Sequence, residues 1–535
     1  MKSGMIILQP WLSSLKRPDV EGIDPMIWVY ICSSVSFAVF SLVGLAFYRL
    51  YLSPLAKFPG PRLAAVTGLY ETYYDIVQDG QFVWQIERLH QQYGPIVRIK
   101  PSELHVQDPD YYNTLYSGPT SKRNKDAWFS YLGWPQSIFS TEGHTLHRVR
   151  RSVLGQFFTR RAILDLEPVI QANIQALSHH FRQAESTHGS LELHAAFLCF
   201  ASDTISQHAF GQRNGFHSLD RAELDAVWKK KVNSSFELVQ VARHMPWLCK
   251  LAHAIPRVAG SINPCFYEVI QMETDVKQMV RNAIHERGMV SSEKAAKAIY
   301  PAILEHEKVP EEEKEFTRLA DDAIFLMIAG TDAPSQALAI TLFHILRHPD
   351  VHERVRGELC AAWEDASMSP GLAALETLPY FTAVLKEGLR LSSIVTTRLP
   401  RIAPDEDLQF HEWEIPRGTP VSMSTFFILR DPKIFPDPSS FRPERWLLEP
   451  DELRRLESYL VPFSKGTLGC LGPNMTWVWM YLVLGTLVRK FEMTLYDTTE
   501  RNLEMVRDKF IGQTKPGLNR IQVKVLGEYN KVDRS

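Results

Sequence analysis

A cysteine set among glycines, just ahead of an apolar segment, is the feature of this sequence best suited to chemistry. Cys470 lies in the stretch Phe463-Ser-Lys-Gly-Thr-Leu-Gly-Cys-Leu-Gly472, and Pro473 opens the segment that follows. Proline suits the first turn of a helix, where free backbone N–H groups stabilise a thiolate. Gly466 and Gly469 would let a flat, bulky group approach the backbone. A thiolate presented in this way can serve as an axial ligand of haem iron.

The spacing of this loop resembles the haem-binding signature of the cytochrome P450 superfamily, Phe-x-x-Gly-x-Arg-x-Cys-x-Gly. Phe463, Gly466, Cys470 and Gly472 fall in register, but Leu468 stands where the family usually has an arginine that reaches a haem propionate. The resemblance implies haem b (iron protoporphyrin IX) ligated by Cys470, with Phe463 and Gly466 beside it. A lone cysteine can also be a small buried hydrophobe, so other motifs are needed to choose.

A second motif pairs opposite charges. Glu387 and Arg390 are three residues apart, so they share one face of a helix and can pair. Alone, such a pair is usually a surface ion pair of little worth. The stretch Phe441-Arg-Pro-Glu-Arg-Trp446 follows before the cysteine loop. Together they resemble the family's Glu-Arg-Arg triad, with Arg445 as its third member, which implies a buried structural group.

The segment Phe325–Ser335 lies where the family carries the helix that handles oxygen. It resembles the motif Ala/Gly-Gly-x-Asp/Glu-Thr-Thr/Ser. Ala329, Gly330 and Asp332 match this pattern, but Ala333 replaces the threonine that usually directs protons toward bound dioxygen. Another source of protons is therefore expected.

Several groups in this segment could replace the missing hydroxyl. The resemblance makes Thr331, Asp332 and Ser335 the candidate catalytic residues. Pro334 lacks the N–H that would bond to the Gly330 carbonyl four residues back, and a water could occupy that gap, held by this carbonyl and Asp332. The alternatives are a plain helix kink with a solvated Asp332, or a hydroxyl supplied by the substrate.

Cations are expected beside the haem propionates. His147–Arg151 resembles the family's Trp-x-x-x-Arg helix, with His147 in the tryptophan place and Arg151 in the arginine place. Arg398 resembles a second propionate contact. Because guanidinium groups pair bidentately with carboxylates, Arg151 and Arg398 are expected to compensate for Leu468.

Other basic side chains are expected on the thiolate side of the haem, where they would face an acidic electron donor. The resemblance places Arg148, Arg150, Arg442 and Lys465 there. For Arg148 and Arg150 the alternative is a basic helix face that points to solvent.

The candidate substrate-contacting residues are mostly apolar. Trp128–Trp134 lies in the place of the family's first substrate-recognition loop, and Ile394–Thr396 follows the Glu-x-x-Arg helix. Phe325, Ile328 and Ala329 belong to the oxygen-handling segment. Aromatic stripes more often form core than pocket, but as a group these residues predict a lipophilic small-molecule substrate with few polar handles.

Helices must position most of these groups. The expected fold class is mainly α with small β-sheets, a cytochrome P450 fold preceded by one N-terminal transmembrane helix. The acidic stretch 305–315 is predicted to be a solvated loop. Periodicity predicts long helices over 165–183, 222–245, 266–287 and 317–348, and strands at 96–100, 104–107, 420–423 and 521–525.

Residues 26–48 are predicted to span a membrane as a helix. No charged residue occurs from Pro25 to Tyr48, and the run is long enough to cross a bilayer. Trp28 and Tyr51 suit an aromatic belt at the two interfaces. A buried core helix and a cleaved signal peptide are the alternatives, and the flanking charges leave orientation open.

Resemblance to microsomal members supplies the orientation. It implies a short lumenal segment at 1–25, a transmembrane helix at 26–48, a proline-rich hinge at 49–62 and a haem-thiolate catalytic domain at 63–535. The catalytic domain would then lie in the cytosol, anchored to the endoplasmic reticulum membrane by a single span.

Composition limits the other function classes. The chain has 535 residues, of which 45% are hydrophobic and 22% charged, as in ordinary globular proteins. Its net charge is −2 and it has no basic block, so nucleic acid is not an expected partner. Six scattered cysteines without a C-x-x-C pair indicate free thiols in a reducing compartment.

Taken together, the motifs imply a haem-thiolate monooxygenase that receives electrons from NADPH through NADPH–cytochrome P450 reductase. The N-terminal region resembles fungal secondary-metabolism members of the trichodiene-oxygenase type, which implies a terpenoid or polyketide intermediate as substrate. Two alternatives stay open: a haem-thiolate isomerase or dehydratase that needs no reductase, and a non-catalytic haem-binding membrane protein. Turnover without NADPH would favour the isomerase or dehydratase.

Overall fold

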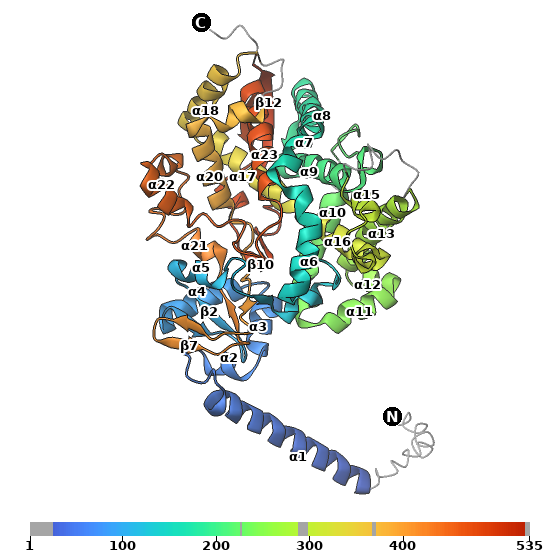
Figure 1. The fold of residues 1–535 in the computed structure, drawn as a ribbon, viewed down its shortest axis with the longest axis vertical. Coiled ribbons are helices and arrows are strands. Elements are labelled where there is room, and N and C mark those ends of the chain that lie inside the picture. Colours follow the sequence, from blue (N-terminus) through green and yellow to red (C-terminus); the bar gives the residue numbers. More distant parts are fainter. Residues whose placement is uncertain (1–24, 225–226, 287–297, 366–370, 530–535) are drawn as a thin grey trace, which may run out of the picture.

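A mostly helical body makes up the molecule, and one long helix projects from it (Figure 1). The computed structural model describes residues 25–224, 227–286, 298–365 and 371–529. The first short helices gather with β2 (Leu104–Val106) and β7 (Trp413–Ile415) at one end of the body, next to the projecting helix, whereas β12 (Gln522–Glu528) lies toward the opposite end (Figure 1).

The longer helices of the body form its centre. Several begin with proline in the first turn, as at Pro264 and Pro379, where a missing N–H costs nothing. Their bounds are α8 Glu167–Ser186, α9 Leu193–Phe210, α10 Val227–His244, α13 Pro264–His285, α16 Phe316–Ala329, α17 Asp332–Arg347, α18 Pro349–Ala362 and α20 Pro379–Ser392.

Shorter helices connect and cover these. They are α2 Arg62–Val66, α3 Leu69–Thr72, α4 Phe82–Tyr93, α5 Tyr112–Leu115, α6 His144–Gly155, α7 Arg160–Asp165, α11 Pro246–Ala254, α12 Pro256–Ile262, α15 Ile299–Glu305, α19 Leu372–Glu376, α21 Thr425–Ile428, α22 Pro450–Glu457, α23 Pro473–Trp479 and α24 Gly485–Lys490.

Four small sheets complete the fold. The largest has the order β1-β2-β8-β5-β3, and a second has the order β4-β12-β9. The strand bounds are β1 Ile96–Arg98, β2 Leu104–Val106, β3 Asn124–Lys125, β4 Ser190–Glu192, β5 Arg401–Ile402, β6 Leu408–Phe410, β7 Trp413–Ile415, β8 Pro420–Ser422, β9 Phe491–Tyr496, β10 Arg507–Lys509, β11 Ile511–Gln513 and β12 Gln522–Glu528. β6 pairs with β7 and β10 with β11.

One apolar core unites the long helices. It buries side chains from α8, α9, α13, α16, α17, α20 and α23, and burial of each large one contributes about 1.5–3 kcal/mol to the stability of the fold. Representative members are Leu177, Phe197, Met272, Ile324, Leu342, Leu385 and Val478.

The predicted strands at 96–100, 104–107, 420–423 and 521–525 are confirmed as β1, β2, β8 and β12. The predicted helix over 317–348 is interrupted: α16 ends at Ala329 and α17 begins at Asp332. Gly330 and Pro334 explain the break, because glycine is a weak helix former and proline cannot donate to the Gly330 carbonyl.

The acidic stretch 305–315 is not the fully solvated loop that the sequence predicts. Glu313 is buried, and its carboxylate accepts hydrogen bonds from Arg318 at 2.7 Å and from Arg150 at 3.3 Å. Sequence polarity cannot distinguish a solvated carboxylate from one that is buried against arginines.

The projecting helix is α1, Pro25–Phe47, which a π-helical turn at Tyr48–Leu52 continues. The span Met26–Leu52 has a mean hydropathy of 2.0, and its most apolar window is not buried at all against the body. The other apolar span of comparable length, Phe316–Arg347, is 67% buried in the core. Met26–Leu52 is therefore the better candidate for a membrane span.

Candidate functional site

A cavity of about 400 Å³ lies within the body, and its wall is mostly apolar. Cys470 lies in this wall, as do Ala329, Gly330 and Ala333 from the break between α16 and α17. The two segments that the sequence analysis singled out for chemistry thus share one cavity. The size and the mostly apolar wall of the cavity suit a large planar group together with an apolar ligand.

The cysteine loop is held by its own backbone. The N–H of Cys470 donates to the Phe463 carbonyl at 2.9 Å, and α23 begins three residues later at Pro473. The Cys470 side chain is exposed to the cavity, and the N–H of Gly472 points at its sulfur from 3.4 Å. Burial raises the pKa of the Cys470 thiol, while this N–H and the nearby Arg151 oppose that rise.

Two glycines of the loop lie close to the protein's own backbone, which leaves little room for a side chain at either position. Gly466 has a φ of +73°, and a Cβ on it would lie 2.1 Å from the carbonyl oxygen of Ser117. A Cβ on Gly469 would lie 3.2 Å from the Gly466 carbonyl oxygen. Gly466 is therefore required by the turn and by its contact with the Ser117 backbone, whereas a Cβ on Gly469 would make a tight contact only.

Two cations face each other across neighbouring strands at this cavity. Lys125 on β3 is the register partner of Arg401 on β5, and both side chains are buried and line the cavity. Like charges placed directly opposite in a sheet destabilise it. Burial, together with Arg401 and Arg151, lowers the pKa of Lys125 well below its usual value.

None of the cavity's cations Lys125, Arg151 and Arg401 forms an ion pair with a carboxylate within the described ranges. Lys125 Nζ donates to the carbonyls of Ile138 and Phe139 at 2.8 and 2.7 Å. Arg151 donates to the carbonyls of Gly469 and Cys470, and Arg401 to those of Leu399 and Pro400. Lys125 and Arg401 are buried and Arg151 is partly buried. Three such basic side chains without a carboxylate partner fit a ligand that brings its own carboxylates.

His147 lies in the same wall and is buried. Its burial, and then the charges of Lys125 and Arg151, lower the pKa of its imidazole to about 2. His147 is consequently neutral near pH 7, and it can donate or accept one hydrogen bond there without adding charge. Haem b combines a large apolar ring with two propionates, so this donor set fits it.

Arg398 does not join this group, contrary to the sequence-based expectation. Its guanidinium donates to Glu103 at 2.6 and 2.9 Å and to Glu71 at 2.6 Å, and it does not line the cavity. Arg401, three residues further on, lines the cavity instead. Lys125, which the sequence analysis did not single out, lines the cavity as well.

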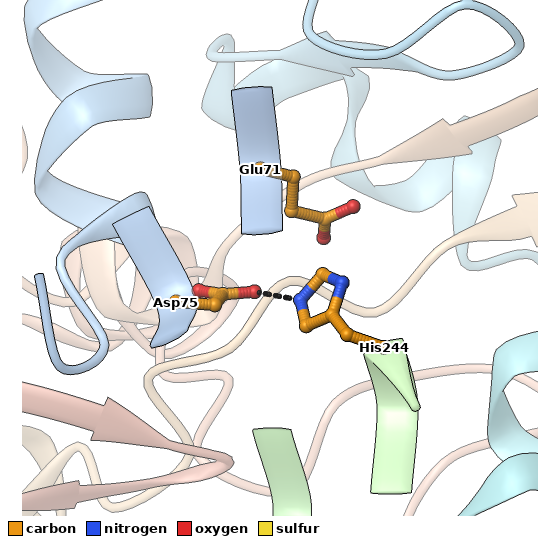
Figure 2. A group of neighbouring side chains, drawn as sticks. All are labelled: Glu71, Asp75 and His244. Carbon is orange, nitrogen blue, oxygen red and sulfur yellow. Dashed lines mark hydrogen bonds and ion pairs between the residues drawn. The ribbon is translucent and has the colours of Figure 1, made fainter. Parts of the chain in front are cut away.

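Glu71 also belongs to a compact cluster with Asp75 and His244 (Figure 2). Glu71 comes from α3 and His244 from the end of α10, and His244 Nε2 lies 2.8 Å from Asp75 Oδ2. Arg243, Arg398 and Lys100 surround the Glu71 carboxylate at 2.6, 2.6 and 3.0 Å. These cations neutralise it, so the cluster joins α3 to α10 and offers no free carboxylate to a metal ion.

The three candidate catalytic side chains of the oxygen-handling segment do not line the cavity. Thr331 donates to the Met327 carbonyl at 2.7 Å and accepts from Trp228, and Ser335 donates to the Thr331 carbonyl. Asp332 is completely buried, with Gln336 donating to it at 2.7 Å. Only the Gly330 backbone, Ala333 and Pro334 of this turn reach the cavity.

The Glu-Arg-Arg group is assembled beside α20. Arg390 donates to both carboxylate oxygens of Glu387 at 2.9 and 2.8 Å, and Arg445 donates to Oε1 of Glu387 at 2.9 Å. Trp446 adds a further bond to Oε2 at 3.0 Å. Glu387 and Arg390 are fully buried, so the group holds the segment before the cysteine loop against α20.

Many of the expected substrate-contacting residues line the cavity, but Trp128, Ser130, Tyr131 and Thr396 do not. Trp128 is buried against Phe129 in a stacked pair, and Thr396 donates to Asp508 at 2.9 Å. Glu273 and His253 line the cavity but carried no signal in the sequence. The lining members of the expected set are Phe129, Trp134, Phe325, Ile328, Ala329, Ile394 and Val395.

The proposed basic surface loses one of its members. Arg150 is buried and donates to Gln136, Thr141 and Glu313, so it cannot face an electron donor. Arg148 is exposed, and the exposed Arg442 pairs with Asp437.

Comparison with known proteins agrees with this site. The model of the family "Cytochrome P450" matches residues 59–519. Tryptophan 6-hydroxylase fscE of Fusarium equiseti is 39% identical over 92% of this chain and 94% of its own length. Conidiogenone synthase PchP450 of Penicillium rubens is 38% identical over 90% of this chain and 96% of its own.

Two further matches extend the likeness to the whole chain and to the fold. Cytochrome P450 monooxygenase TRI4 of Fusarium sporotrichioides is 34% identical over 97% of this chain and 99% of its own length. The solved structure "Retinoic acid bound cyanobacterial CYP120A1" has a TM-score of 0.68 at 20% identity, covering 88% of this chain and 99% of that one. The chain therefore belongs to the cytochrome P450 family, and it is an oxygen-incorporating oxidoreductase of the fungal secondary-metabolism type.

Proposed function

We propose that the protein inserts one oxygen atom from O2 into a lipophilic secondary-metabolite intermediate of the terpenoid or polyketide class. The observation that carries this proposal is the apolar cavity in which Cys470 meets Lys125, Arg151 and Arg401, three basic side chains that donate hydrogen bonds to backbone carbonyls. Relatives named for conidiogenone synthesis and for tryptophan hydroxylation support secondary metabolism as the setting.

The residues divide the work within the cavity. Cys470 would hold the iron, and Lys125, Arg151 and Arg401 would bind the propionates in place of the missing arginine at Leu468. When bound, haem supplies the activation of dioxygen. Phe129, Phe325 and Ile394 line the apolar wall and would orient a lipophilic substrate while they exclude water.

The protein's own contribution to proton delivery would come from the helix break. Because Pro334 has no N–H, the Gly330 carbonyl is free to accept a hydrogen bond from a water in the cavity. Ala333 leaves room beside it, and both residues line the cavity. The turn itself would be held in place on the side away from the cavity. Asp332 lies beside His194, Thr331 donates to the Met327 carbonyl, and Ser335 donates to the Thr331 carbonyl.

We also propose the supply of electrons and the location. NADPH–cytochrome P450 reductase would deliver electrons from NADPH, with exposed Arg148 as one docking cation. Residues 26–48 would anchor the protein in the endoplasmic reticulum membrane, with 1–25 lumenal, 49–62 as a hinge and 63–535 in the cytosol. The exposed, apolar Met26–Leu52 span supports the anchor.

The experiment is reconstitution of the full chain with the reductase in lipid vesicles, with terpenoid and polyketide intermediates supplied under isotopically labelled dioxygen. The expected product carries one labelled oxygen atom and forms only when NADPH and reductase are present. Turnover without NADPH would contradict the proposal and favour an isomerase or dehydratase. Tight haem binding with no product and no spectral response to any intermediate would favour a non-catalytic protein.

A further inference from the structure

One carboxylate interrupts the apolar wall of the cavity. Glu273, on α13, is only 5% exposed and lines the cavity, although it is distant in sequence from every motif described above. A leucine or methionine could complete an apolar wall at a lower cost in free energy, because burial of a charged group is unfavourable unless partners compensate it. The position of Glu273 is therefore not explained by packing.

The partners of Glu273 reach both of its oxygens, but most of these contacts are long. Lys277 donates to Oε2 at 3.0 Å, while Trp134 Nε1 reaches Oε1 at 3.2 Å. His253 Nε2 is shared between both oxygens at 3.3 Å each. A carboxylate has about four acceptor sites, and the His253 and Trp134 contacts are at the long end for hydrogen bonds.

The environment favours the ionised form of this carboxylate. Burial acts to raise the pKa of Glu273. The hydrogen bonds and the positive charges of His253 and Lys277 outweigh this effect, so that the pKa is lowered. In turn, the hydrogen bond to Glu273 raises the pKa of His253. His253 and Trp134 also line the cavity, and they come from α11 and from the loop before α6. An ionised acceptor thus lies at the cavity wall, where its contacts with His253 and Trp134 are longer than its contact with Lys277.

We infer that Glu273 is a substrate subsite, whose carboxylate accepts a hydrogen bond from an amine or hydroxyl group on an otherwise apolar substrate. The incoming donor would replace the long His253 contact, and Lys277 would keep Oε2 occupied. This inference rests on the proposed function and refines it, because it requires a substrate with one hydrogen-bond donor rather than a bare hydrocarbon.

Three matched probes test the subsite in the haem-loaded full chain: tryptamine, tryptophol and 3-ethylindole. They share one ring and differ in ending with an ammonium, a hydroxyl or a methyl group. The blue shift of the Soret band on titration gives an apparent Kd for each. Since a hydrogen bond to a charged group discriminates strongly, we expect the wild type to prefer tryptamine or tryptophol over 3-ethylindole by about tenfold.

Glu273→Gln should remove most of that preference while it leaves the affinity for 3-ethylindole within about twofold. Glu268→Gln is the matched control, because Glu268 lies on the same helix and pairs with Lys230 outside the cavity. It should keep the wild-type preference. If Glu273→Gln does not fold, Glu273→Asp, which keeps the charge but withdraws it by one methylene, should weaken the preference instead.

Several outcomes would overturn the inference. One is that the Glu273 variants keep the wild-type preference for tryptamine or tryptophol, and another is that the wild type binds all three probes with equal affinity. The inference also fails if none of the probes binds below millimolar concentration, or if the Soret band shifts to the red, which marks an amine bound to iron. An equal loss of affinity for all three probes would make Glu273 a structural link between α11 and α13. Formation of the labelled product in the reconstitution with reductase, alongside any of these, would show that only the inference fails, and not the proposed function.

Discussion

His194 Nε2 lies 3.2 Å from Oδ1 of Asp332, at the start of the helix that follows the break. Both His194 and Gln336, the second partner of Asp332, line a separate cavity of about 60 Å³ that shares no lining residue with the cavity of Cys470. The Asp332 carboxylate is therefore held on the other side of α17 from the chemistry. It positions the turn and does not contact a ligand in the main cavity.

Replacement of Asp332 by alanine should lower the free energy of unfolding by about 1–3 kcal/mol, because it leaves Gln336 and His194 without their buried partner. The apparent Kd for a lipophilic ligand should change little. Denaturant unfolding and Soret titration measure the two quantities. Asp332→Asn keeps the shape and should be milder; a large loss of NADPH-to-product coupling in this variant would show that the carboxylate does reach the proton path.

Replacement of Ala333 by valine or by threonine adds side chains of nearly the same shape, in which threonine carries a hydroxyl where valine carries a methyl group. Both would displace a water held by the Gly330 carbonyl, but only threonine returns a hydroxyl. We therefore expect Ala333→Val to lower the fraction of NADPH electrons recovered in product several-fold, and Ala333→Thr to stay within about twofold of wild type. Peroxide release measured beside product formation gives this fraction. Equal behaviour of the two variants would contradict a proton path at this turn.

Arg401 and Arg398 are predicted to differ sharply on replacement by methionine. Arg401→Met should lower haem content per chain with little loss of folding stability, because Arg401 has no carboxylate partner. Arg398→Met should cost about 3–5 kcal/mol of stability, because Glu103 loses its closest cation inside the protein. Haem quantification and denaturant unfolding of the haem-free chains separate the two effects. The opposite pattern would restore Arg398 as the propionate contact.

Acid should destabilise the protein as the pH falls below about 6.5. Burial lowers the pKa of His90 and His208 to about 4 and that of His344 to about 3. On acidification the unfolded chain binds protons before the folded chain does. The contribution of these histidines to the free energy of unfolding is therefore fully present above about pH 6.5 and is lost as the pH falls toward 4, by on the order of 3 kcal/mol per histidine. Asp508, whose pKa burial raises to about 6, offsets part of this loss.

Thermal denaturation midpoints between pH 7.5 and 5 measure this dependence. His208→Gln is the informative variant, since glutamine can still donate to the Phe157 carbonyl that His208 contacts at 3.1 Å. We expect it to flatten the pH dependence. A midpoint that does not fall on acidification, or the same slope in the variant, would show that these histidines are not buried as neutral groups.

Short spacings in the sequence were enough to find the cysteine loop and the group around Glu387. The cysteine loop is one turn, and Glu387 and Arg390 share one helix face, so local geometry fixes these relations. Arg445, 58 residues after Glu387, was assigned through the family resemblance. The strands β1, β2, β8 and β12 were also found from short local runs of residues, although only β12 alternates between buried and more exposed positions. The sequence also showed that Leu468 replaces the arginine usual in the family, and it therefore predicted that other cations take over the propionate contact of that arginine.

Longer-range pairing could not be predicted in this way. Arg398 and Arg401 are three residues apart in one segment, and the pairing of β5 with β3 places Arg401 opposite Lys125 at the cavity. The direction of Asp332 depends on the packing of α17 against α9, which carries His194. Glu273 looks like any polar residue of an amphipathic helix until α13 is placed against the cavity.

The most direct test of the whole account is the carbon monoxide spectrum of the reduced, haem-loaded protein, recorded for the wild type and for Cys470→Ser. The account predicts the strongly red-shifted Soret band of thiolate-ligated haem in the wild type, and its loss in a variant that remains folded. A folded wild-type protein without that band, or a variant that keeps it, would contradict ligation of haem iron by Cys470.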